Sequence, residues 1–255
     1  MIVLIRLRSY VERVNYMDKA NLYEGLTELC LMERAKNYNH WIESVCSKYI
    51  YGDLLEVGAG IGTYTHNWLK YAETVKVFEI APNCYSILKH RFSANDRIEL
   101  FLNDVQIYRE ELLEKFDSAV SVNVFEHVKN DILGFENVYK YLKPGGLLIL
   151  FVPAFQILYG KTDQAVGHYR RYSKKELSKT LKGIGFQVRD MRYVNLLGFF
   201  SWLLYKNKSD VLTEQKIDFF DRIFVPVLSR TERYYSPPLG QSLFLVATKE
   251  GSLTF

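Results

Sequence analysis

The sequence has few cysteines, no long apolar run and no dominant charge. Its three cysteines, Cys30, Cys46 and Cys84, are widely spaced and form no CxxC pair. This pattern excludes a disulfide framework and a cysteine-rich zinc site. We therefore expect a reducing, cytoplasmic setting and no metal site.

Segments that direct a chain into a membrane are also lacking. Residues 1–5 are apolar, but Arg6 and Arg8 interrupt them too early for a signal peptide. The most apolar later runs, residues 147–155 and 196–204, fall well short of the roughly 20 residues that span a bilayer as a helix. We expect no integral membrane segment, and peripheral contact with a membrane stays open.

Charge gives no sign of a nucleic-acid partner. The 33 basic residues oppose 29 acidic ones along the whole sequence, so the net charge of +4 creates no strong field. We see no basic stripe and no appended RNA-binding module, and we expect no nucleic acid as partner. With 255 residues, 48% of them hydrophobic, the chain can bury one sizeable core, so we expect a single domain over 1–255, as monomer or homodimer.

Helical and strand patterns alternate through the middle of the chain. Apolar residues at helical spacing predict helices within 1–50 and between the strands. Ser173, with Glu176 three residues later, predicts the start of one of these helices, and Ile132 is expected on the buried face of another. Strands are expected at 54–57, 75–79, 97–102, 118–123, 147–152, 186–194 and 243–248. This alternation predicts a parallel sheet with helices on both faces.

The chain divides into a core at 51–194, a helical insertion at 195–240 and a last strand at 241–250. The insertion is rich in aromatic side chains and is expected to cover the mouth of the sheet as a cap. It could shape an acceptor pocket, form a dimer contact or touch lipid, and we expect core or interface. Its large aromatic residues are Phe199, Phe200, Trp202, Phe219, Phe220 and Phe224.

A glycine-rich turn follows the first strand of the core. Gly58, Gly60 and Gly62 stand at alternate positions, where a backbone needs positive φ or lies close to a ligand. The N–H groups of such a turn and the helix behind it can receive a polar group such as an amino-acid carboxylate. A dinucleotide site would place the third glycine one residue later, at Thr63. Glu79 ends the next strand, where its two oxygens can accept hydrogen bonds from both ribose hydroxyls of a nucleoside.

The segment from Glu56 to Gly62 resembles the first motif of class I S-adenosylmethionine-dependent methyltransferases. Further segments resemble that family in order: residues 103–105, 123–127 and 142–146, the last as the turn before the fifth strand. The resemblance covers about residues 35 to 190. It implies a three-layer α/β, Rossmann-like fold with a seven-stranded, mostly parallel sheet, an antiparallel last strand, N-terminal helices and a helical insertion before that strand.

The resemblance also implies S-adenosylmethionine as the cofactor and assigns its contacts. In the family, the opening acid of the motif lies under the methionine part and an aspartate contacts the adenine amine. The positions so assigned are Tyr38, Glu56, Gly58, Ala59, Gly60, Gly62, Glu79, Ile80, Asn103, Asp104, Val105, Asn123 and Val124. Tyr38 resembles an aromatic residue that closes over the cofactor, where its face would attract the sulfonium, but it could equally pack in a helix beside Trp41.

Methyl transfer from a sulfonium is an in-line displacement, so positioning supplies much of the catalysis. For a hydroxyl acceptor, a group that titrates near neutrality helps to remove the proton, and His168 and His127 are the candidates near the expected mouth. Both could instead be structural. Further candidates, for contact with the acceptor, are Asp163, Arg170, Arg171 and Tyr172. The arginines could clamp a carboxylate or phosphate, or belong to a solvated basic face.

We therefore expect an enzyme that methylates a hydroxyl, rather than an amine, of a small molecule such as a sugar, a lipid or a natural-product intermediate. A nicotinamide-dependent oxidoreductase is the alternative enzyme, disfavoured by the glycine spacing. A non-catalytic methyltransferase-like binding protein is the alternative from another class, and RNA methylation stays open.

Overall fold

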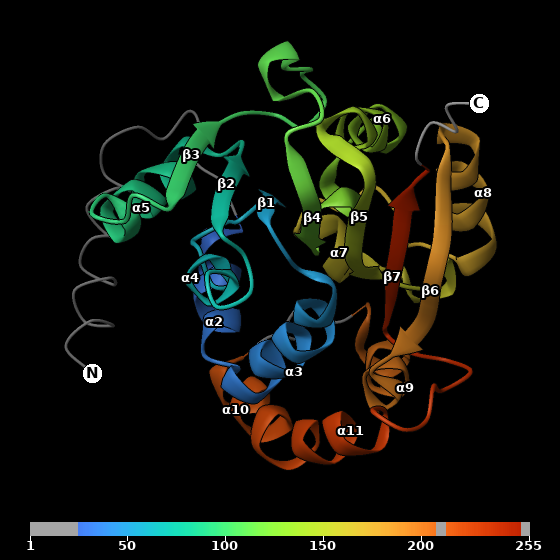
Figure 1. The fold of residues 1–255 in the computed structure, drawn as a ribbon. Helices are drawn as coiled ribbons and strands as arrows, with labels where there is room; N and C mark the ends of the chain where they lie inside the picture. Colours follow the sequence, from blue (N-terminus) through green and yellow to red (C-terminus); the bar gives the residue numbers. More distant parts are fainter. Residues whose placement is uncertain (1–24, 208–212, 251–255) are drawn as a thin grey trace.

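The computed structural model describes residues 25–207 and 213–250, and a seven-stranded sheet forms its centre (Figure 1). The strands lie in the order β3-β2-β1-β4-β5-β7-β6. Neighbours from β3 to β5 are parallel, whereas β7 is antiparallel to both β5 and β6. This arrangement confirms the predicted fold class. The strands are β1 (Asp53–Val57), β2 (Thr74–Glu79), β3 (Ile98–Leu102), β4 (Phe116–Val122), β5 (Leu142–Pro153), β6 (Phe186–Val194) and β7 (Ser242–Lys249).

Helices cover both faces of the sheet and create two hydrophobic clusters. Alternate residues of β5 enter opposite clusters: Leu148 and Leu150 join one, and Ile149 and Phe151 join the other. A strand covered on both faces is expected to be apolar without interruption, as β5 is. The helices of the core are α2 (Leu26–Glu33), α3 (Lys36–Cys46), α4 (Thr65–Trp68), α5 (Pro82–Phe92), α6 (Asp131–Tyr141), α7 (Lys161–Ala165) and α8 (Lys174–Ile184), with short 3₁₀ turns at Ser47–Tyr49, Glu110–Leu112, Phe125–His127 and Gln156–Leu158.

Local sequence signals set several of these boundaries. The Ser173 hydroxyl accepts the Glu176 N–H at the start of α8, as predicted, and Gly185 ends the helix in the left-handed conformation. Two expectations were wrong. Ile132 is 49% exposed rather than buried. The strand predicted at 147–152 begins at Leu142, directly after α6, so the predicted turn at 144–146 lies inside β5 as an unpaired stretch, with Gly145 at φ +83°.

The insertion before β7 forms α9 (Leu196–Tyr205), α10 (Glu214–Ile223) and α11 (Val225–Thr231). Helices α10 and α11 pack against α3, at the lower side of Figure 1. The aromatic side chains of the insertion divide between core and surface: Phe199 is buried, whereas Phe200 and Phe219 are 50% and 60% exposed. Within residues 25–207 and 213–250, no helix combines the length and apolarity needed to cross a membrane.

Candidate functional site

The glycine turn after β1 is closely packed from two sides. Gly58 and Gly62 both have positive φ, +73° and +83°. A Cβ atom on Gly58 would lie 2.5 Å from both methyl groups of Val124, and one on Gly62 would lie 2.6 Å from Cε2 of Phe92 on α5. The turn therefore requires glycine for conformation and for close approach. It contacts the segment after β4 directly.

Glu79 joins the end of β2 to this turn. Its Oε2 accepts the Gly60 N–H at 2.7 Å, and its Oε1 accepts the Ala81 N–H at 2.8 Å. Burial raises the pKa of the carboxyl, while the backbone N–H groups oppose that rise. The carboxylate is thus fixed at the turn, at the carboxyl edge of the sheet where open α/β folds bind ligands.

Apolar side chains stand exposed beside Glu79 at the same edge. Ile80, after β2, is 61% exposed, and Leu102, at the end of β3, is 50% exposed. The Asp104 carboxylate accepts the Gln106 N–H at 2.9 Å, and Asn103 Nδ2 donates to the Asp104 carbonyl at 2.8 Å. The order of a carboxylate, exposed apolar side chains and a second carboxylate suits a nucleoside, with its ribose at one end and its base at the other.

Glu56, at the end of β1, has a buried carboxylate with one unused oxygen. Its Oε1 accepts the Trp68 Nε1–H at 2.9 Å. No residue in the described part of the chain hydrogen-bonds Oε2. Burial raises the pKa of this carboxyl to about 7. A buried oxygen without a partner is suited to a donor group of a ligand, such as an ammonium.

The segment after β4 contacts the glycine turn. Asn123 has a φ of +53° and is exposed, and Val124 packs on Gly58. Tyr38 reaches this edge from α3. Its ring lies edge-on to Trp41, and its buried phenol, whose pKa rises to about 12 through desolvation, hydrogen-bonds Ser242 and Asn195. Tyr38 therefore packs within α3 beside Trp41, as one of the two alternatives predicted, and its contact with a cofactor stays a prediction.

The insertion fixes the helix that carries Tyr38. Asp221 of α10 accepts the Tyr38 N–H at 2.8 Å and the Asn37 N–H at 3.2 Å. These are orphan donors of the first turn of α3, so Asp221 caps α3 from a distant part of the chain. No sequence pattern near α3 signals this cap.

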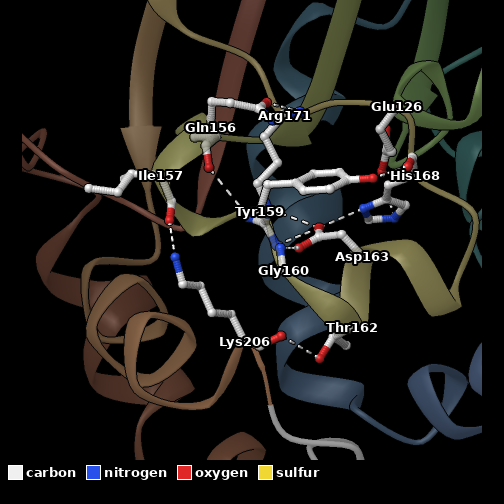
Figure 2. Close-up of polar contacts among 11 residues, drawn as sticks. Glu126, Gln156, Ile157, Tyr159, Gly160, Thr162, Asp163, His168, Arg171 and Lys206 are labelled. Carbon is white, nitrogen blue, oxygen red and sulfur yellow. Dashed lines mark hydrogen bonds and ion pairs between the residues drawn. The ribbon is translucent and has the colours of Figure 1, made fainter.

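A second group of polar side chains lies beyond β5, in the segment that contains α7 (Figure 2). Asp163 is buried and binds His168 Nδ1 at 2.8 Å and Arg171 Nε at 2.9 Å, both through Oδ1. Its Oδ2 accepts the Gly160 N–H at 3.0 Å. Burial opposes ionisation of Asp163, but the hydrogen bonds from His168 and Arg171 outweigh it and lower the pKa.

Glu126 and His127 face this group from the segment after β4. Glu126 is fully buried, and its Oε1 lies 3.9 Å from His168 Nε2. The His127 ring stands edge-on to the His168 ring, with 4.6 Å between centroids. Burial raises the pKa of Glu126 to about 7, and burial together with the charge of His168 lowers the pKa of His127 to about 4. The structure thus brings the two predicted histidines together and adds Glu126, which sequence reasoning missed although it directly precedes His127.

The other predicted acceptor contacts are placed differently. Arg171 is 4% exposed, holds Asp163 and stacks over Trp202, so its guanidinium is turned into the protein. Arg170 and Tyr172 both contact Asp131, the first residue of α6. Val105, predicted as a cofactor contact, is buried, and its carbonyl accepts Asn137 Nδ2.

Comparison with known proteins bears on the same part of the chain. Residues 55–148, from β1 into β5, match the family model of a methyltransferase domain. A curated relative, the probable ribosomal RNA small subunit methyltransferase A of Methanococcoides burtonii, is 42% identical over 52 residues. That match covers 20% of this chain and 19% of the relative, so the chain spans about a fifth of the length of this curated relative.

Solved structures with the same fold extend over most of the chain. Phosphoethanolamine N-methyltransferase 2 of Haemonchus contortus, determined with S-adenosyl-L-methionine, has a TM-score of 0.60 at 16% identity, covering 89% of this chain and 58% of that one. An S-adenosylmethionine-dependent methyltransferase of Mesorhizobium loti has a TM-score of 0.54 at 15% identity, covering 77% and 90%. These likenesses show the fold. With the domain match, they confirm the resemblance predicted from the sequence.

Proposed function

We propose that this chain, which carries a methyltransferase domain on the class I fold, transfers a methyl group from S-adenosylmethionine to a hydroxyl of a small molecule. The observation that carries the proposal is the common segment 123–127. Through Val124 it packs on the glycine turn, and through Glu126 and His127 it lines the polar group around His168. One loop therefore connects the glycine turn, the proposed site of the methyl donor, with a group that can act on the acceptor.

The cofactor is held by the residues at the edge of β1 to β4. Glu79 receives the ribose hydroxyls, Ile80 and Leu102 enclose the base, and Asp104 accepts its amine. The unpartnered Oε2 of Glu56 lies in the strand that leads into the turn and can accept a donor from the methionine part. Bound in this way, the cofactor supplies an activated methyl group, and the chain orients it.

The acceptor is proposed to lie against Glu126, His127 and His168. In the transfer, the acceptor O–H bond would break and its proton would pass to Nε2 of His168, while a new O–CH₃ bond would form and the S–CH₃ bond would break to leave S-adenosylhomocysteine. Asp163 holds Nδ1 of His168, so Nε2 is the nitrogen that faces Glu126 and the acceptor side. A hydroxyl acceptor is favoured over an amine because the imidazole of His168 can accept the proton that the hydroxyl loses.

Two other functions are less well supported by the site. A nicotinamide-dependent oxidoreductase would place the third glycine of its turn one residue later, at the position that Thr63 occupies. A binding protein without catalysis would have no use for the buried cluster at Glu126. RNA methylation, the activity in the name of the curated relative, is the main alternative for the acceptor.

Two assays test the proposal. Calorimetry should show binding of S-adenosylhomocysteine and no binding of NAD. Replacing Gly60 by a bulky residue should abolish the binding of S-adenosylhomocysteine. Incubation with labelled methyl donor and separated extract fractions should then label a compound in the small-molecule fraction. Label only in RNA would refute the small-molecule acceptor. Binding of NAD in place of S-adenosylhomocysteine would refute the cofactor.

A further inference from the structure

We propose that Glu126, His127 and His168 form a binding site for one divalent transition-metal cation. Each of these residues offers one ligand atom, and the three atoms lie within 4.8 Å of one another. Two imidazoles and one carboxylate on one side of a cation form a set that leaves the opposite side open for other ligands. The cysteine pattern of the sequence predicted no metal site, but this site uses none of the cysteines.

The buried carboxylate of Glu126 is the first argument. The residue is 0% exposed, and neither of its oxygens has a hydrogen-bond partner in the described part of the chain. A buried carboxylate without partners is costly, and coordination to a cation compensates it. The nearby Arg171 does not fill this role, because its guanidinium is bound to Asp163.

The orientation of the imidazoles is the second argument. His168 is bound through Nδ1 to Asp163 at 2.8 Å, which leaves Nε2 directed toward Glu126 (Figure 2). His127 is hydrogen-bonded to the backbone of Gly167, which fixes its ring as well. Histidines that bind metals typically donate their other ring N–H to a carboxylate or a backbone carbonyl in this way. The chain thus provides the supporting contacts of a metal site.

The distances require only a small closure. Nε2 of His168 lies 3.9 Å from Glu126 Oε1. Metal–ligand bonds of about 2.1 Å place neighbouring ligand atoms about 3 Å apart, so the two groups must approach by about 1 Å. We expect rotation about the side-chain bonds of Glu126 to supply this approach. The mixed nitrogen and oxygen set favours Zn²⁺, Mn²⁺, Co²⁺ or Fe²⁺ over Ca²⁺, which takes only oxygen.

A role for the cation rests on the proposed function. Bound at the acceptor side of segment 123–127, it would coordinate the acceptor oxygen at an open position and lower the pKa of that hydroxyl. The released proton would pass to water. His127 and His168 would then act as ligands, in place of the general-base role predicted from the sequence.

Zinc titration of the wild-type protein, without cofactor or acceptor, tests the site directly. The chain contains five histidines, so NMR of ¹⁵N-labelled imidazoles can follow each one. We expect one equivalent of Zn²⁺ to shift the ring nitrogens of His127 and His168 and to leave those of His40, His66 and His90 unchanged. No shift at His127 and His168, or shifts only at the other three, would overturn the proposal whatever the behaviour of any variant.

Variants provide the matched comparison. Glu126→Gln and His168→Asn should lose Co²⁺ binding at one equivalent, measured by visible absorption and by metal retained after dialysis. His66→Asn, a change at an exposed histidine of α4, should keep it. Undiminished binding in folded Glu126→Gln and His168→Asn would contradict the assignment. Retained metal with no methyl transfer would count against the proposed function alone, and methyl transfer without metal binding would count against this inference alone.

Discussion

Replacing Gly58 by alanine should destabilise the protein much more than the same change at Gly145. Both glycines have positive φ, +73° and +83°, so both substitutions force a Cβ into the left-handed region at about 1–2 kcal/mol. Only at Gly58 does the new atom meet neighbours, the Val124 methyl groups at 2.5 Å. At Gly145 nothing lies within 4 Å. Overpacking adds about 1–3 kcal/mol, so we expect about 2–5 kcal/mol at Gly58.

Urea unfolding of the two variants measures this difference, with Gly145→Ala as the control for backbone strain alone. Because Val124 must move, Gly58→Ala should also lower the affinity for S-adenosylhomocysteine, measured by calorimetry, whereas Gly145→Ala should leave it unchanged. Adding Val124→Ala to Gly58→Ala should recover part of the lost stability. Equal destabilisation by the two glycine substitutions would refute the argument that the turn and the segment after β4 are packed against each other.

Three further predictions concern carboxylates. Glu79→Ala should weaken binding of S-adenosylhomocysteine by more than about 1 kcal/mol in calorimetry, and unchanged affinity would contradict its place in the site. Asp221→Ala should lower the free energy of unfolding in urea by about 1 kcal/mol through loss of the α3 cap, whereas Asp218→Ala, at a partly exposed residue that pairs with Arg34, should lower it less. The pKa of Glu56 is raised from 4.5 to about 7, so the unfolded chain loses this proton first and stability should fall, by up to roughly 3 kcal/mol, as pH rises through that range. In Glu56→Gln the free energy of unfolding should depend less on pH over this range. An unchanged pH profile in this variant would contradict the raised pKa of Glu56.

Much of the fold was predictable because its signals are local. The alternation of apolar runs and helical spacing placed every strand of the sheet to within a few residues, and Ser173 marked the start of α8. Ile132 was misplaced because helical spacing identifies an apolar position but not whether a neighbouring element covers it. The strand β5 began earlier than expected, at Leu142, which pairs with Phe116 of β4; the register then shifts, and regular pairing with β4 and β7 begins at Leu147, where the strand was predicted to start.

The glycine turn and Glu79 were predictable for the same reason, and the polar group around His168 was not. Glycines and a strand-end acid occupy fixed positions along the chain, so sequence order alone indicates them. The polar group around His168 depends on contacts between different segments of the chain. The sequence predicted Arg171 as a contact with the acceptor, but in the structure its guanidinium binds Asp163, and Glu126 lies beside His168, which comes from a separate segment of the chain.

The sequence by itself determined the succession of strands and helices along the chain, the glycine turn and the acid that follows it. These features depend on hydrophobic periodicity and on the backbone requirements of single residues. Only the tertiary structure decided that Asp221 caps α3 and that Glu126, His127 and His168 converge. The physical reason is that a buried carboxylate takes its properties from whatever packs around it, and that neighbourhood is assembled from segments far apart in the chain.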